Sequence, residues 1–520
     1  MTALLLLQTK TVRCPGGSGP LFFEYIYAST LSLSPCLMQR SKLISILSTF
    51  SVKEMKQFEK WMQSDLFNSN PRLHALTVYL SRFYPSFDHE ALDKTEVHRE
   101  IFPGESYSDA RMRNLISDLQ AKAEEFLSWL HLAQHPVAKK QFLLSELNRR
   151  KLYSLFPSRL KEAKDALLNS GLGSTYATVF NFLLDREEYG FHYAQHFGQV
   201  YKAFRKYDNR KIIRSVSDLY LSNLLYYYQI LLDNERIFGK KTEAFHSLAE
   251  LAEQLYRETG QDNLLTAIHL RIIGLLRTGE VKHYRAIKKD LGKKEFDRAA
   301  VNEKQSIVTI LTNFALRQHL FGNPAFLKEL VELSAIALQK KLCFRDGFIS
   351  HIFFFNFTYY NILLGRTADA KNFVKKYSAN LQPGVKESTL HYSDAYICFA
   401  EKKYSEALHH LGKVSYDTPQ RYIGIKNVLL KIYYEKGDLE PVAFVVDSIR
   451  HKMQGAAFFS DYYLEAEKKF LHYFTILMSA RTGARGSSKK KLENMKKELG
   501  SPGYVFHREW LLEMAKEQAG

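Results

Sequence analysis

The chain has 520 residues, and its 46% hydrophobic and 25% charged residues are ordinary globular values that allow a sizeable buried core. Glycine (26) and proline (13) are scarce, so the composition disfavours an architecture of short strands and turns and favours long helices. The formal net charge of +18 permits nucleic acid, anionic membranes and acidic proteins as partners, because such a surface attracts any anion.

Residues 1–37 differ from the rest of the chain because they lack helical periodicity and hold two of the four cysteines. Their apolar run, residues 4–7, is too short for a secretory signal. A clean helical pattern begins after Met38, so we treat 1–37 as an irregular segment and hypothesise that translation starts at Met38. The sequence has no CxxC pair, which leaves a zinc ribbon or redox motif unsupported and favours reduced thiols in the cytoplasm.

Residues 38–135 are predicted to form a compact unit of four helices. Ser51 and Glu54 have the capping-box spacing at the start of the first helix. Proline suits the first turn of a helix, so Pro71 is expected to open the second. The other two helices are expected over about 94–101 and from about Ser108 onward.

Over residues 136–480 helical segments alternate with short turns, which predicts a solenoid of stacked helical hairpins. The carboxyl end, 481–520, is predicted to be a flexible basic linker followed by a short helix over 505–516. The segment 347–365 contains no Asp, Glu, Lys or Arg and is long enough to span a membrane, but its His and Asn side chains make burial in lipid costly. We therefore expect a core helix there, apolar on all sides, and no transmembrane segment.

Internal repeats are the most informative feature of the sequence. Three turn regions align, at Gly365, Lys402 and Gly437, and each is predicted to end one helix and open the next. The close-packing positions that follow these turns lie 37 and then 35 residues apart, at Ala370, Ala407 and Val442. Turns at Gly279 and Gly322 look equivalent but are 43 residues apart, which predicts longer helical pairs upstream.

Over about 350–455 the chain resembles the tetratricopeptide repeat, a helical hairpin of roughly 34 residues. The best copy, 388–421, has Ala395 and Ala407 at the two small-residue positions and Pro419 at the hairpin-ending position. Three positions depart from the usual aromatic, leucine and tyrosine residues: His391, Asp394 and Cys398. The resemblance implies a superhelical array whose groove binds peptides or other proteins, and it implies no catalytic activity.

The sequence contains no GxxxxGK[ST] phosphate loop, no HExxH and no GxSxG motif. Glu188, His192 and His196 recur every four residues, and two His with one Glu form a legitimate zinc set. However, Gly190 interrupts the segment, and one metal would struggle to reach groups spread over about 12 Å of helix axis. We interpret the three as surface or packing residues and predict no catalytic residue, metal site or cofactor.

Two basic regions are weak candidates for anion binding. Asp208 is predicted to cap a helix, which places three cations in or near the first turn, where they oppose the helix dipole. These cations are Arg210, Lys211 and Arg214. Residues 481–498 hold seven Lys or Arg against two Glu, and a flexible basic stretch binds phosphates without sequence preference. Its longest lysine run is Lys489, Lys490 and Lys491. In both regions a solvated surface is the simpler interpretation.

We therefore predict an all-α protein, an α-solenoid of stacked helical hairpins with an N-terminal helical unit. Its predicted function is that of a non-catalytic scaffold that binds a protein or peptide in its groove. Two alternatives stay open: a nucleic-acid-associated protein, which rests on charge alone, and an enzyme whose catalytic residues lie far apart in sequence. A groove lined with Asn, Tyr and apolar residues would favour peptide binding, whereas a closed pocket with converging carboxylates or histidines would favour an enzyme.

Overall fold

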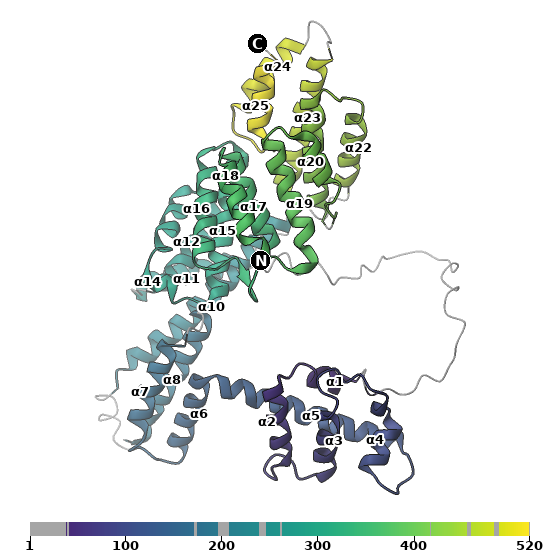
Figure 1. Cartoon of the computed structure of the whole chain (residues 1–520). Helices are drawn as coiled ribbons and strands as arrows, with labels where there is room; N and C mark the ends of the chain where they lie inside the picture. Colours follow the sequence, from purple (N-terminus) through teal and green to yellow (C-terminus); the bar gives the residue numbers. More distant parts are fainter. Residues whose placement is uncertain are drawn as a thin grey trace, which may run out of the picture. The chain divides into compact units, whose positions relative to one another are not determined.

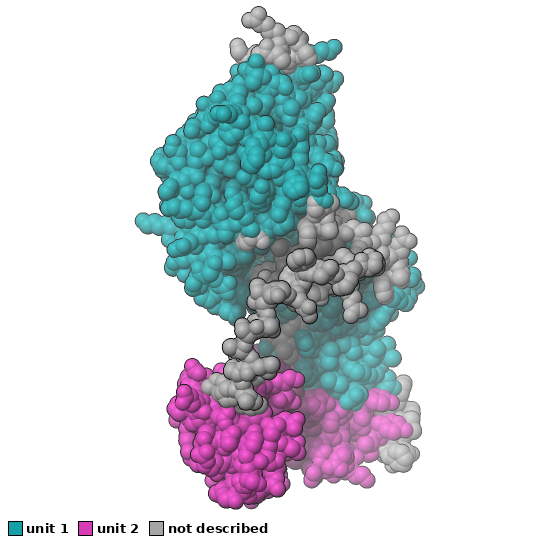
Figure 2. Space-filling model, turned by 90° about the vertical axis from the view of Figure 1, so that its right-hand side faces the viewer, with its two compact units in different colours: residues 1–9, 170–186, 204–520 teal, residues 10–169, 187–203 magenta. Residues whose placement is uncertain are grey.

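A computed structural model of the chain describes residues 38, 41–170, 174–195, 207–238, 246–259, 263–416, 418–454, 459–482 and 488–518. Nearly all regular structure within them is α-helical, which confirms the predicted fold class. The irregular segment expected over 1–37 lies outside the described residues. The chain divides into two compact units, which Figure 2 draws in different colours.

Unit 2 comprises residues 10–169 and 187–203, and the helix α8 contributes residues to both units. Its helices are α1 Lys42–Leu47, α2 Val52–Gln63, α3 Pro71–Ser81, the short 3-10 helix η3 Glu90–Leu92, α4 Lys94–Ile101, α5 Asp109–Gln134, α6 Pro136–Arg149, α7 Phe156–Leu168 and part of α8 Ser174–Gln195.

The predicted starts of α2 and α3 are confirmed, but α1 precedes them, so the described residues of 38–135 hold five α-helices and not the four expected. Ser51 Oγ accepts a hydrogen bond from the Glu54 N–H at 3.2 Å, and the Glu54 carboxylate accepts one from the Ser51 N–H at 2.7 Å. This capping box satisfies two backbone donors that a helix start leaves unpaired. Pro71 occupies the first turn of α3. The long helix α5 packs its apolar face on the others, with Phe126 in ring contact with Phe58.

Unit 1 comprises residues 1–9, 170–186 and 204–520. Its helices are the start of α8, then α10 Asn209–Phe238, α11 His246–Thr259, α12 Leu264–Thr278, α13 Val281–Asp290, α14 Lys294–Asp297, α15 Val301–Phe321, α16 Ala325–Gln339, α17 His351–Leu363, α18 Thr367–Tyr377, the 3-10 helix η5 Ser378–Asn380, α19 Pro383–Ala400, α20 Tyr404–Leu411, α21 Pro419–Lys436, α22 Val442–Met453, α23 Asp461–Arg481, α24 Ser488–Leu499 and α25 Arg508–Glu517.

Successive helices of unit 1 pair as hairpins, and the hairpins stack. The pairs α15–α16, α17–α18, α19–α20, α21–α22 and α23–α24 are each in contact. The second helix of a hairpin also contacts the first helix of the next, as in α16–α17, α18–α19 and α20–α21. Figure 1 shows α17, α18 and α19 side by side. We call α15, α17, α19, α21 and α23, which open these hairpins, the first helices.

The three aligned turns end their helices in the same way. Gly365, Lys402 and Gly437 all have positive φ, between 59° and 78°. In each turn the following N–H donates back to a carbonyl five residues earlier, at 2.8 to 3.0 Å. This is the Schellman ending, which requires a left-handed residue after the helix. The close-packing residues Ala370 and Ala407 are fully buried.

A two-residue β-hairpin joins α16 to α17. Strands β1 (Phe344–Arg345) and β2 (Phe348–Ile349) pair antiparallel, with Phe344 opposite Ile349. Asp346 and Gly347 both have positive φ, as a tight type I′ turn requires. This hairpin was not predicted, although the pair Asp346-Gly347 is a strong signal for such a turn. The hairpin fixes the point at which α17 begins.

Aromatic side chains fill the spaces between the helices of unit 1. Tyr284 of α13 is in ring contact with Phe314 of α15 and Phe326 of α16, at centroid distances of 5.4 Å each. Phe355 of α17 stacks on Tyr392 of α19 at 4.1 Å. Such contacts account for much of the high aromatic content by packing between neighbouring helices.

Candidate functional site

A pocket of about 210 Å³ lies among the first helices α15 and α17 and the helix α16 between them. The walls combine apolar side chains with carboxamides and hydroxyls, among them Gln305, Thr309, Asn313, Ile352, Asn356 and Tyr360. No charged side chain is found among the described residues that line it, although the chain carries a net charge of +18. A pocket of this composition accepts an uncharged, partly apolar group.

Two carboxamides give the pocket its hydrogen-bonding capacity. Asn313 of α15 and Asn356 of α17 are half-buried, and neither amide pairs with another group in the described part of the chain. Their neighbours are engaged: Gln305 donates to the Leu342 carbonyl at 2.7 Å, and the Thr312 hydroxyl donates to its own helix. The two asparagines are therefore free to bind a ligand.

The helix α17 explains why the segment 347–365 lacks charged residues. Phe354, Thr358 and Tyr360 are buried in the core, whereas Ile352 is 39% exposed at the pocket. The expected core helix is therefore present, but it is not apolar on all sides, because the face that lines the pocket carries Asn356. No helix among the described residues is long and apolar enough to cross a membrane.

The thiol of Cys343, which also lines the pocket, is not poised for nucleophilic chemistry. Burial raises its pKa to about 12, so the thiol stays protonated at neutral pH. Its Sγ lies 3.8 Å from the Ala337 carbonyl.

A second group of polar side chains lies under the carboxyl-terminal segment. Glu467 of α23 is fully buried and accepts a hydrogen bond from Asn427 of α21 at 3.0 Å. Burial raises the pKa of Glu467 to about 8 and lowers the pKa of Lys431 to about 8. The water-excluded surroundings and the nearby Lys431 hold the pKa of His507 well below its usual value. Shifted pKa values are typical of catalytic sites, but Glu467 and Lys431 are at most 4% exposed and so closed to a substrate.

A third polar group is buried among α10, α12 and α15. The two ring nitrogens of His269 lie 2.9 Å from the Gln229 carboxamide and 2.9 Å from the Glu303 carboxylate. All three side chains are buried, so each ring nitrogen finds its partner inside the protein. We interpret this group as structural.

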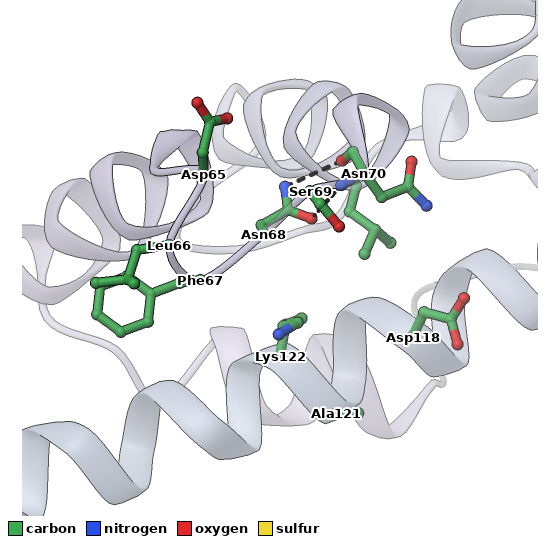
Figure 3. Close-up of a pocket in the computed structure, with 10 residues that line it drawn as sticks. Asp65, Leu66, Phe67, Asn68, Ser69, Asn70, Asp118, Ala121 and Lys122 are labelled. Atoms are coloured by element: carbon green, nitrogen blue, oxygen red, sulfur yellow. Dashed lines mark hydrogen bonds between the residues drawn. The ribbon is translucent and has the colours of Figure 1, made fainter.

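Unit 2 carries a hollow of about 540 Å³ between the loop that follows α2 and the helix α5 (Figure 3). Asn68 holds the loop, donating to the carbonyls of Met62 at 2.9 Å and Asn70 at 3.0 Å. Lys122 pairs with Glu125 at 3.0 Å. Both polar groups serve the local fold, and Leu66 at the rim is 83% exposed.

Two of the three basic residues predicted near the start of α10 form ion pairs with carboxylates of this chain. Arg210 Nε lies 2.8 Å from Asp208, and its guanidinium lowers the pKa of that carboxyl. Lys211 Nζ lies 3.3 Å from the buried carboxylate of Asp185, while Arg214 is exposed. Arg210 and Lys211 therefore neutralise acidic groups of this chain.

The basic segment at the carboxyl end is helical over much of its length, and the prediction of flexibility through residue 498 was wrong. Residues 488–499 form α24, whose Leu492, Met495 and Leu499 are buried in one apolar cluster with side chains of α23 and α25. Lys490 and Lys491 are exposed on its other face, while residues 483–487 and the side chain of Lys489 lie outside the described part. Leu492, Met495 and Leu499 are spaced three and four residues apart, which is typical of an amphipathic helix. The prediction considered only the lysines of this segment.

The helix α8 runs without interruption from Ser174 to Gln195, so the expected break at Gly190 was wrong. Lys164 Nζ lies 2.5 Å from Glu188. His196 lies outside the described residues. Within the described ranges no group of three or more His, Cys, Asp or Glu side chains is placed to hold a metal ion.

The fold defines this chain as an all-α protein of stacked helical hairpins. Comparisons with protein-family models, curated proteins and solved structures found no match.

Proposed function

We propose that the chain is a non-catalytic scaffold that binds a peptide or protein segment at the pocket of α15 and α17. The observation that carries this proposal is that two carboxamides without hydrogen-bond partners in the described part of the chain, Asn313 and Asn356, lie in one pocket whose lining has no charged side chain. A carboxamide offers both N–H donors and a carbonyl acceptor, so it can pair with the C=O and N–H of a peptide backbone whatever the side chains. The apolar wall then selects an uncharged side chain of the partner.

The tetratricopeptide-like pattern over 350–455 supports the same function. That resemblance implies a groove along stacked hairpins, and α17 lies within the range it covers. The combination of Asn, Tyr and apolar residues in one pocket is the composition expected for peptide recognition. Arg210 and Lys211 form ion pairs with Asp208 and Asp185, so they are less available to phosphates than the sequence suggested. This weakens the nucleic-acid alternative.

Selection from a displayed peptide library against the full chain tests the proposal. We expect enrichment of a common uncharged motif that contains an aliphatic or aromatic residue. The same selection against an N313D/N356D variant should lose that motif, because each change replaces the amide donors with a negative charge. Enrichment of one motif by both proteins, or of none by either, would contradict the proposal.

Fluorescence anisotropy with generic labelled DNA and RNA tests the alternative. The scaffold proposal predicts no binding at physiological salt. Salt-sensitive binding that a K490E/K491E variant weakens would instead favour phosphate contacts through α24. These lysines are exposed, so the substitutions leave the packed face of α24 intact.

A further inference from the structure

Residues 500–518 leave the hairpin order and lie across first helices from several hairpins. The N–H of Gly503 donates to the Phe321 carbonyl of α15 at 2.8 Å, and the N–H of Val505 donates to Leu320 at 3.2 Å. The N–H of Phe506 donates to the Ala466 carbonyl of α23 at 3.3 Å. Main-chain hydrogen bonds of this kind are also how many proteins hold an extended peptide.

Aromatic side chains of the segment insert among aromatic side chains of the first helices. Tyr504 is in ring contact with Phe321 of α15 at 5.1 Å, and Phe506 with Tyr463 of α23 at 4.9 Å. The Tyr359 hydroxyl of α17 lies 3.4 Å from His507 Nδ1. The segment thus spans α15, α17 and α23 with alternating main-chain and ring contacts.

The helix α25 continues the same contact onto α21. Trp510 stacks on Phe474 of α23 at 6.1 Å, and its Nε1 donates to Glu435 of α21 at 2.7 Å. Leu511 and Met514 are buried in the same apolar cluster as Phe474. An aromatic anchor with a satisfied N–H and an apolar helix face is typical of a helix that binds a partner surface.

Several buried polar atoms in the segment and in the helices that it covers lack partners. Glu467 Oε1, Asn427 Oδ1, His319 Nδ1 and Arg508 Nε are buried and find no hydrogen-bond partner among the described residues. His507 has φ of 54°, a conformation that is costly for a residue with a side chain. These penalties oppose the apolar burial, so docking is less favourable than its contact area suggests.

We propose that the first helices α15, α17, α21 and α23 form an interaction surface for an aromatic peptide segment, and that residues 500–518 occupy it as a displaceable ligand within the same chain. This inference goes beyond the proposed function, because residues 500–518 do not line the pocket of Asn313 and Asn356. A partner segment with aromatic residues spaced like Tyr504, Phe506 and Trp510 binds to this second surface only when residues 500–518 leave, so this surface is autoinhibited in the unliganded chain while the pocket stays open.

A labelled synthetic peptide of residues 500–518 tests the proposal on the full chain. In an F506A/W510A variant the resident segment is weakened, so we expect the peptide to bind at least tenfold more tightly than to the unmodified chain. Lys516 is exposed on α25, and the K516A control should behave like the unmodified chain. A folded double variant that does not bind the peptide, or equal binding by all three proteins, would overturn the proposal.

If the double variant does not fold, hydrogen exchange on the unmodified full chain tests whether residues 500–518 detach without global unfolding. The proposal predicts that the amides of Gly503, Val505 and Phe506 exchange together and faster than the core amides of α23. Exchange at the same rate as the core of α23 would mean that the segment leaves only on global unfolding, which excludes a displaceable ligand. Neither experiment involves Asn313 or Asn356, so failure here leaves the library selection as a separate test.

Discussion

Glu467 illustrates how single ionisable groups tie the stability of this fold to pH. Its pKa in the folded protein is about 8, above its ordinary value of 4.5. A raised pKa means that the folded state retains a proton that the unfolded state loses. The stabilising contribution is therefore complete below pH 4.5 and declines as pH rises through 8, with a slope of about 1.4 kcal/mol per pH unit between these values.

The first prediction is that E467Q is increasingly more stable than the unmodified chain as pH rises from 5 to 8. Glutamine cannot ionise, and its carbonyl still accepts the hydrogen bond from Asn427. Urea unfolding at several pH values measures the difference, with E465Q on the exposed face of α23 as control. A difference that does not change with pH would contradict the assignment of a buried, protonated Glu467.

Lys431 has the opposite dependence. Its pKa falls from 10.5 to about 8, so its contribution to stability is present above pH 10.5 and is lost as pH falls through 8. Its Nζ lies 4.7 Å from the Phe399 ring centre, a contact that offsets only part of the desolvation.

We therefore predict that K431M raises the free energy of unfolding at pH 7 and that this gain shrinks toward pH 10. Methionine keeps the unbranched shape and packs against Phe399 without a charge. The matched control is K436M, because Lys436 is exposed at the end of the same helix. Denaturant unfolding at both pH values gives the comparison; a loss of stability at pH 7 would show that the ammonium group has a favourable partner.

At the scale of elements, the sequence predicted features that depend on a few neighbouring residues, such as helix starts and turns. It did not predict contacts between residues far apart in the chain. The capping box at Ser51, the proline start of α3 and the left-handed turns depend on a few consecutive residues, so the sequence revealed them. The pocket depends on Asn313 and Asn356, which lie on different helices and line one pocket only because the hairpins pack together. The one signal was an asparagine within an uncharged run. The helix α24 was not predicted because the segment was interpreted from its lysine content and not from the helical spacing of Leu492 and Met495.

The left-handed residues that end the helices lead to a prediction about stability. Gly365 has φ of 74° and open space around its missing Cβ, so G365A should destabilise the chain by about 1 kcal/mol through backbone strain alone. Lys402 adopts the same conformation with a side chain, so K402G should be stabilising by a similar amount. Gly384, also in open space but in the first turn of α19, is the control, since its backbone is not left-handed and G384A should not destabilise the chain. Thermal unfolding measures all three; destabilisation by K402G would contradict the shared turn geometry.

At the scale of the whole molecule, stacking turns short helical pairs into a continuous layer of first helices. Each hairpin buries its apolar face only against its neighbours, so the layer forms as a unit. One part of the layer carries the uncharged pocket, and another part carries residues 500–518. The sequence predicted the stacking, but it gave no sign that the chain's own carboxyl end lies on that layer. The peptide-binding function stays a prediction.

Isothermal titration with the library-selected peptide tests the central claim most directly. The account predicts that N313A/N356A weakens binding about 5- to 150-fold, because two neutral hydrogen bonds are together worth about 1 to 3 kcal/mol. N372A, which removes an exposed asparagine on α18, should bind like the unmodified chain. Unchanged affinity in N313A/N356A would show that the peptide binds elsewhere and would contradict the assignment of this pocket.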